Sequence, residues 1–301
     1  MNWHWNELLK TIAMPETNKK ELGALITLLD EPDENAFGHI RERIVSFGDE
    51  AIPDLEIARD NIFEGIVQER IESIIKKIRN EILKNEFTDW INFGSSDLLK
   101  GFLLVSKTHH PEIEQENIII KLEQIKMDAW LELNDNLTAL ENIKVLNHIF
   151  YELHNFEANR INLHIPENYY LNTLLDTKKG SPLTLGMLYI IIAQKLNIPV
   201  FGVDLPQHFI LAYTTAMVRP LPDVNDVLFY INPFNGGAIF TRKEIDLFIH
   251  QLKIKPIESY YAPCTNVDII KRLLLNLKFS LTQSGNIEKT EELDNLLNAM
   301  E

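Results

Sequence analysis

The sequence lacks the features of several large classes of protein. It has a single cysteine, Cys264, which excludes an internal disulfide and is typical of a reducing compartment. Its longest apolar run, from Leu185 to Ala193, is far shorter than the roughly 20 residues that span a bilayer. The first residues, Met1–Glu7, contain no basic stretch followed by an apolar core, so no signal peptide is expected. Together these absences predict a cytoplasmic protein.

Positive charge is also scarce. The 301 residues include 29 Lys and Arg against 44 Asp and Glu, which gives a formal net charge of -15. A surface this acidic repels phosphate backbones and anionic lipid, so we expect neither nucleic acid nor a membrane as a partner. The hydrophobic share of 45% is enough for a folded core. The remaining partner class is a protein or a peptide, whose identity the sequence does not give.

The first half of the chain has the periodicity of helices. Apolar residues recur at helical spacing over 22–29 and 52–83, and further helices are expected over 98–105, 113–131 and 136–153. The helix before Pro32, the helix that ends at Gly48 and the following Ile52-Pro53 resemble one HEAT-type helical pair. We therefore predict a helical, HEAT-like region over residues 1–90.

The second half has a different pattern. A long apolar helix is expected over 183–196, followed by strands over 200–203, 208–213 and 227–231. Helices over 267–281 and 288–300 form a hairpin that resembles half of a tetratricopeptide repeat. The predicted fold class is α+β, in which a core over 91–255 packs a long helix on a small antiparallel sheet. A helical segment over 256–301 completes the chain.

Three polar side chains stand at meaningful places in this core. Ser181 precedes the apolar helix, His208 begins a strand, and Asn232 ends the next strand before a glycine-rich turn. A helix, then a histidine strand, then an asparagine or aspartate strand is the chain order of papain and transglutaminase sites. That chemistry needs a thiolate at the start of the helix, where the helix dipole stabilises it. No cysteine is there, so a site made of Ser181, His208 and Asn232 is predicted as a remnant.

Other nucleophiles are poor replacements for the missing thiol. Ser181 suits the N-cap of the helix and Pro182 its first position, so both have a structural explanation. Thr184 has the same weakly acidic hydroxyl as Ser181, and a lone cysteine such as Cys264 is usually an inert buried side chain. The neighbours His109 and His110 have no further ligand at metal-binding spacing. We expect no metal and no cofactor.

Several ordered motifs resemble the SirB-type transglutaminase-like family, a bacterial group named after a regulator of invasion genes. They are Asn159-Arg160-Ile161-Asn162, Glu167-Asn168-Tyr169-Tyr170-Leu171, Lys179-Gly180-Ser181-Pro182-Leu183-Thr184-Leu185, Leu196-Asn197-Ile198-Pro199-Val200-Phe201-Gly202-Val203, Pro206-Gln207-His208-Phe209, Ile231-Asn232-Pro233-Phe234-Asn235-Gly236-Gly237 and the block from Pro263-Cys264-Thr265-Asn266 to Leu277-Lys278. The resemblance covers roughly residues 100–285 and implies a transglutaminase-like core. It places Pro182 where transglutaminases keep cysteine and matches the family's histidine to His208. Asn232 stands where an aspartate is usual, and Thr184 where a serine is usual.

These observations favour a non-catalytic protein. We expect a cleft near His208 that binds a peptide or a small ligand, with a regulatory or adaptor role. One alternative is an amide or acyl hydrolase, or an acyltransferase, that uses Ser181 or Cys264 with His208. The other is a purely structural helical adaptor in which His208 is buried.

Overall fold

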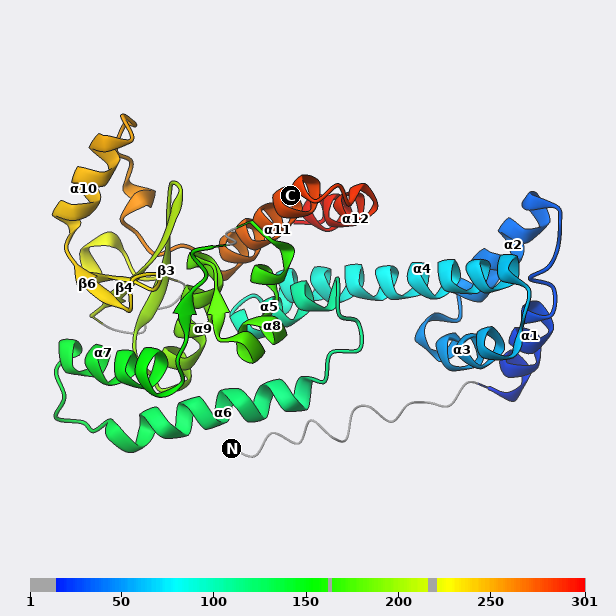
Figure 1. The fold of residues 1–301 in the computed structure, drawn as a ribbon, viewed down its shortest axis with the longest axis horizontal. Helices are drawn as coiled ribbons and strands as arrows, with labels where there is room; N and C mark the ends of the chain where they lie inside the picture. Colours follow the sequence, from blue (N-terminus) through cyan, green and yellow to red (C-terminus); the bar gives the residue numbers. More distant parts are fainter. Residues whose placement is uncertain (1–14, 162–163, 216–220, 301) are drawn as a thin grey trace. The chain divides into compact units, whose positions relative to one another are not determined.

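The computed structural model describes residues 15–161, 164–215 and 221–300 (Figure 1). Residues 1–14 of the predicted N-terminal helical region lie outside these ranges, as does Asn162 of the first family-like motif. Contacts divide the chain into two compact units, residues 1–85 and 86–301, which are described separately. The three-part division at 90/91 and 255/256 stays a prediction, as do the HEAT-like and tetratricopeptide-like assignments.

The first unit is helical. Its helices are α1 (Glu16–Ile26), α2 (Glu34–Val45), α3 (Ile52–Asn61) and the beginning of α4 (Gly65–Asp89). Asp33 caps α2 by accepting hydrogen bonds from two backbone amides, and Pro53 lies in the first turn of α3, where a missing N–H costs nothing. Leu22, Ile44 and Ile71 are among the fully buried side chains of its core.

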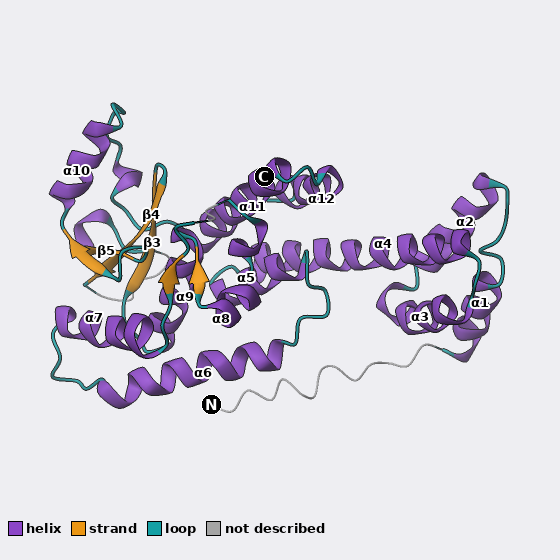
Figure 2. Cartoon of the chain, in the orientation of Figure 1, coloured by secondary structure: helices purple, strands orange, loops and turns teal. Residues whose placement is uncertain are grey.

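The second unit combines helices with two small sheets (Figure 2). Its helices are α5 (Leu98–Lys107), α6 (Gln115–Glu132), α7 (Ala139–Asn147), α8 (Leu171–Thr177), α9 (Pro182–Lys195), α10 (Arg242–Gln251), α11 (Asn266–Gln283) and α12 (Ile287–Asn298). Its strands are β1 (Glu157–Ala158), β2 (Lys179–Gly180), β3 (Val200–Leu205), β4 (His208–Thr214), β5 (Val227–Asn232) and β6 (Ala238–Phe240). The predicted α+β class, with a small antiparallel sheet between helical ends, is confirmed.

The larger sheet is antiparallel, with the strand order β3-β4-β5-β6. The β3–β4 hairpin closes through Pro206 and Gln207, and Gln207 adopts a φ of 61°, as the third position of a type II turn requires. The predicted strands 200–203, 208–213 and 227–231 correspond to β3, β4 and β5. The sequence analysis missed β6 and the parallel pair β1–β2, because strands of two or three residues are too short to show alternation.

The two faces of this sheet contact different helices. Phe209 and Leu211 face α9, since a Cβ added at Gly186 of α9 would lie 2.8 Å from the Phe209 ring and 3.3 Å from Leu211. The opposite face carries Ile210, which packs with Ile245 of α10 in a second apolar cluster. Figure 1 shows α9 and α10 on either side of the sheet. The side-chain alternation of β4 therefore decides which residues can reach the start of α9.

Helix α9 is apolar on every side and buried. All residues from Leu183 to Ala193 are buried, which is typical of a helix at the centre of a domain. Its end is set by Asn197, which adopts a φ of 58°, and by the following Pro199. Within the described ranges, no helix combines the length and the apolarity needed to cross a membrane.

Candidate functional site

The hydroxyl groups at the start of α9 are engaged in hydrogen bonds within the helix cap. The Ser181 hydroxyl accepts a hydrogen bond from the Thr184 amide at 3.2 Å, and the Ser181 amide donates to the Thr184 hydroxyl at 3.0 Å. The Thr184 hydroxyl also donates to the carbonyl of Asn168 at 3.0 Å. Ser181 is 4% exposed and Thr184 is fully buried. Both hydroxyls thus serve as capping groups, and Pro182 between them offers no nucleophile.

His208 lies on the face of the sheet opposite to α9. It pairs with Leu205 at the β3–β4 turn, and the alternation of β4 places it on the same side as Ile210. Its ring is exposed and stacks edge-on against Phe248 of α10, with 4.7 Å between centroids. Partial desolvation of the ring by its neighbours, assisted by the charge of Arg272, lowers the pKa of His208 below its usual value. No described side chain donates a hydrogen bond to the imidazole.

Asn232 holds a turn and does not contact the histidine. Its side-chain oxygen accepts a hydrogen bond from the Phe234 amide at 3.0 Å, and its carbonyl accepts one from the Gly237 amide at 3.0 Å. The turn requires Gly236 and Gly237, with φ values of 60° and 70°. Among the described residues, no hydrogen bond links Asn232 with His208 or Ser181. The structure therefore does not bring these three predicted site residues into one hydrogen-bonded group.

The turn at 232–237 is held from outside by three further side chains. The Tyr151 hydroxyl donates to the carbonyl of Pro233 at 2.9 Å, and the Arg160 guanidinium donates to the carbonyl of Phe234 at 3.2 Å. The Asn147 amide donates to the carbonyl of Gly237 at 2.9 Å. Asn147 accepts in turn from the Tyr189 hydroxyl of α9, also at 2.9 Å. The geometry of the turn is therefore coupled to α7, to α9 and to the segment after β1.

Cys264 lies beside β3. Its thiol donates to the carbonyl of Gly202 at 3.3 Å. Burial, with a smaller effect of the nearby Asp204 and Asp268 carboxylates, raises the pKa of Cys264 to about 12. Since the thiolate is the nucleophile, a thiol with this pKa is almost wholly unreactive at pH 7. The structure gives Cys264 a packing role.

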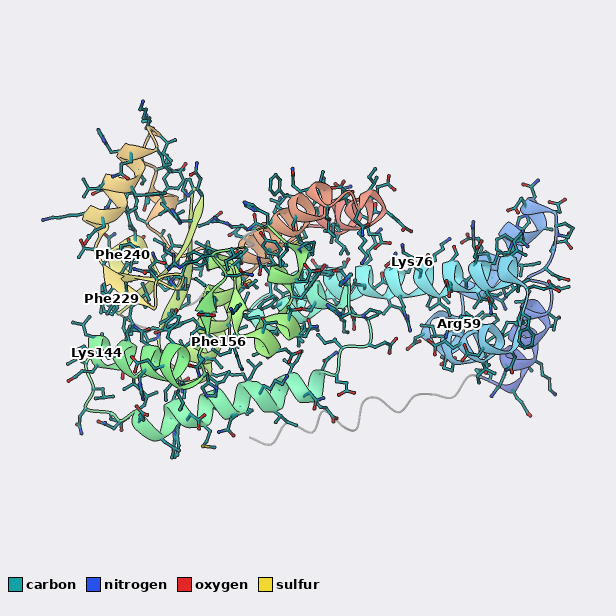
Figure 3. The ribbon with its side chains drawn as sticks, viewed as in Figure 1. Arg59, Lys76, Lys144, Phe156, Phe229 and Phe240 are labelled. Carbon is teal, nitrogen blue, oxygen red and sulfur yellow. The ribbon has the colours of Figure 1, made fainter. Side chains whose placement is uncertain are left out.

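A cavity of about 550 Å³ lies beside the turn at 232–237. It is lined by Tyr151, Phe156, Glu157, Ala158, Asn159, Arg160, Ile161, Lys179, Pro233, Phe234 and Gly236. Its volume is within the range of small-molecule and peptide sites. Phe156, labelled in Figure 3, is buried in the interior of the second unit and forms an apolar wall. His208, Asn232 and Ser181 do not line this cavity, although Pro233 and Phe234 directly follow Asn232.

Sequence reasoning did not assign the cavity, although the signal was present. Asn159, Arg160, Ile161, Pro233 and Phe234 all belong to motifs that carry the family resemblance. The acid–base groups of these motifs, His208 and Asn232, lie outside the cavity lining. Aromatic and backbone groups that recur in several motifs would have indicated a binding surface instead.

The histidine pair 109–110 lies at a second cavity, of about 460 Å³. His109 stacks on Tyr170 with 5.2 Å between centroids, and its ring nitrogen is hydrogen-bonded to Lys289. Burial and the Lys289 charge lower the pKa of both His109 and His110. No group of three or more potential metal ligands occurs in the part of the chain that the structure describes.

These two histidines are expected to make the protein less stable in mild acid. The unfolded chain takes up their protons near pH 6.5, before the folded chain does, so the free energy of unfolding falls as the pH drops through 6.5. The double variant His109→Gln/His110→Gln should lose less of its melting temperature between about pH 7.5 and pH 5.5 than the parent chain. The exposed His39→Gln is the control and should leave the loss unchanged. An equal loss in parent and double variant would refute this assignment.

Comparison with known proteins places the chain in a family. The Transglutaminase-like superfamily matches residues 116–275, which is more than half of the chain. The chain belongs to the transglutaminase-like superfamily. The matched region contains α9, the larger sheet and the residues that line the cavity beside the turn, together with Ser181, His208, Asn232 and Cys264.

Individual relatives agree with this membership of the transglutaminase-like superfamily. A UPF0162 protein of Vibrio cholerae is 27% identical over 195 residues, which are 63% of this chain and 68% of the relative. The UPF0162 protein YchA of Escherichia coli K12 is 25% identical over 199 residues, covering 65% of this chain and 71% of YchA. Human F-box only protein 21 is 26% identical over 151 residues, which are 50% of this chain but 23% of that protein. No solved structure matches the chain.

Proposed function

We propose that this chain is a SirB-type, non-catalytic member of the transglutaminase-like superfamily that binds a peptide or small ligand. The observation that carries the proposal is the absence of an available nucleophile at the start of α9. The position where thiol chemistry needs a nucleophile is occupied by Ser181 and Pro182, and the Ser181 hydroxyl is buried in a capping box with Thr184. A capped, buried hydroxyl without a histidine in reach has no base to activate it.

The cavity beside the turn at 232–237 is the proposed binding site. It combines apolar walls from Phe156 and Phe234 with charged groups from Arg160 and Lys179. Ligand sites usually have this composition, with a few polar groups that fix orientation within an apolar lining. A regulatory or adaptor role follows if the bound ligand is a segment of another protein. The sequence-based placement of the cleft at His208 remains a prediction, and it is tested below.

The hydrolase alternative is tested by turnover. The full chain is incubated with p-nitroanilide amides, with thioesters, and with a glutamine peptide plus a primary amine. We expect no product above buffer. Ser181→Ala should lower stability by about 1 kcal/mol through loss of the N-cap, with no activity to lose. Product formation that disappears in Ser181→Ala or in Cys264→Ala would overturn the non-catalytic assignment.

The position of the cleft is tested by comparing His208→Ala with Phe234→Ala. His208 does not line the cavity, so ligand affinity should be unchanged in His208→Ala. Phe234 lines it, and removing its ring should weaken binding about tenfold or more. The opposite pattern would place the ligand at His208, as the sequence alone predicts.

A further inference from the structure

The open edge of strand β1 borders the cavity. Strand β1 runs parallel to β2, and its bonds to β2 come from alternate residues: the Glu157 amide donates to the carbonyl of Lys178 at 2.8 Å, and the Asn159 amide donates to the carbonyl of Gly180 at 3.0 Å. Backbone groups alternate in direction along a strand, so the N–H and C=O of Ala158 point away from β2. Ala158 also lines the cavity. No described backbone or side-chain group bonds to the N–H or C=O of Ala158.

Positive charge is concentrated around this edge in an otherwise acidic chain. Arg160 is exposed and lies over the Phe234 ring, with 5.0 Å from its Cζ to the centroid. Its bond to the Phe234 carbonyl leaves other guanidinium donors available for a carboxylate. Lys179 is paired with Glu157 at 3.0 Å, and both side chains are more than half exposed, so this ion pair is weak and exchangeable. With Glu157 as the one carboxylate among the lining residues, Arg160 and Lys179 leave the rim with a net positive charge, in a chain whose net charge is -15.

We infer that the cavity binds an extended peptide segment in which acidic residues alternate with apolar ones, and that the peptide adds to the open edge of β1. This inference rests on the proposed function and specifies its ligand. The N–H and C=O of Ala158 pair with the peptide backbone, as in other cases of strand addition. The acidic side chains bind Arg160 and Lys179, while the apolar side chains pack on Phe234 and on the exposed Ile161, which also lines the cavity. A free carboxylate or an apolar small molecule would not contact the Ala158 backbone, the cationic side chains and the apolar side chains together.

The test is a titration of the full chain with a fluorescein-labelled octapeptide of alternating valine and glutamate. Binding is expected, and the corresponding valine–lysine peptide should bind about tenfold more weakly or worse. Arg160→Glu should reduce affinity for the glutamate peptide by about tenfold or more, whereas the exposed Lys144→Glu, outside the cavity lining, should change it less than about twofold. Failure of the glutamate peptide to bind would overturn the inference.

Two readouts isolate the backbone pairing from the charge effect. Two peptides are compared, one N-methylated at every valine and the other at every glutamate. In a peptide strand paired with β1, only every second backbone amide of the peptide faces β1. The isomer that is methylated at those amides should lose binding, and the other isomer should retain it. The Ala158 amide should exchange quickly in the free chain and slowly at saturation, whereas the Glu157 and Asn159 amides, already bonded, should change little.

The outcomes separate this inference from the proposed function. If both N-methylated isomers bind as well as the parent, or if the Ala158 amide stays unprotected, strand addition is wrong. A non-catalytic binding function would still stand in that case. If the peptide is cleaved or joined to an amine, the proposed function itself is wrong.

Discussion

Replacing Gly237 with alanine is expected to destabilise the second unit by about 2–5 kcal/mol. Gly237 is buried and has a φ of 70°, a region that costs an L-residue about 1–2 kcal/mol. The added Cβ would also lie 2.0 Å from the Asn147 side-chain oxygen, and relieving such overpacking typically costs about 1–3 kcal/mol more. Urea denaturation followed by the fluorescence of the buried Trp90 measures the loss.

The neighbouring glycine supplies a matched control. Gly236 has a φ of 60°, but no atom lies within 4 Å of the Cβ it would gain. Gly236→Ala should therefore show only the backbone cost, about 1–2 kcal/mol. If the two variants lose the same stability, Asn147 does not constrain the turn, and the described coupling between the turn and α9 through Tyr189 is absent.

Phe209→Ala is expected to cost about 3–5 kcal/mol, because it empties the contact between the sheet and α9. The Phe209 ring is 2% exposed and fits against two glycines, Gly186 of α9 and Gly202 of β3. A Cβ at Gly202 would lie 2.6 Å from this ring. The ring therefore fits only because neither glycine carries a side chain. The same urea titration measures the loss.

Phe279→Ala is the control for this variant, since the Phe279 side chain is 52% exposed. Its loss should stay below about 1 kcal/mol. A double variant offers a second check: Gly186→Ala should be less harmful in a Phe209→Leu background than in the parent, because the smaller side chain relieves the overlap. Equal losses in both backgrounds would contradict the proposed packing.

Much of the core could be predicted from the sequence because its signals are strong and local. Helix α9 is a continuous apolar run between a serine–proline start and Asn197-Ile198-Pro199, and each of these features has a direct physical meaning. Strands β3 to β5 are rich in β-branched and aromatic residues. The capping box at Thr241 and Glu244 is an equally local signal for the start of α10.

The candidate site was harder to predict, because it depends on which face of β4 meets α9. His208 and Ile210 point one way, and Phe209 and Leu211 point the other. Both sets contain large apolar side chains, so the alternation alone does not reveal which face meets the helix. The chain order of helix, histidine strand and asparagine strand is present, but order along the chain does not fix the direction of a side chain.

The cavity beside the turn could not be predicted from the sequence for a related reason. Its lining combines residues near 151, 156–161, 179 and 233–236, which are far apart along the chain. The parallel pairing of β1 with β2 brings two of these segments together, and the hydrogen bonds from Tyr151 and Arg160 bring the turn to them. Long-range contacts of this kind leave no periodic signal in the sequence.

The most direct test of a non-catalytic binding role is one NMR titration of the isotope-labelled full chain with the valine–glutamate octapeptide, in which the peptide is analysed afterwards. The account predicts that amide shifts concentrate at 157–161 and 233–236, around the cavity, and that the peptide is recovered intact. Shifts centred on His208 and Phe248, or recovery of a cleaved or modified peptide, would contradict it.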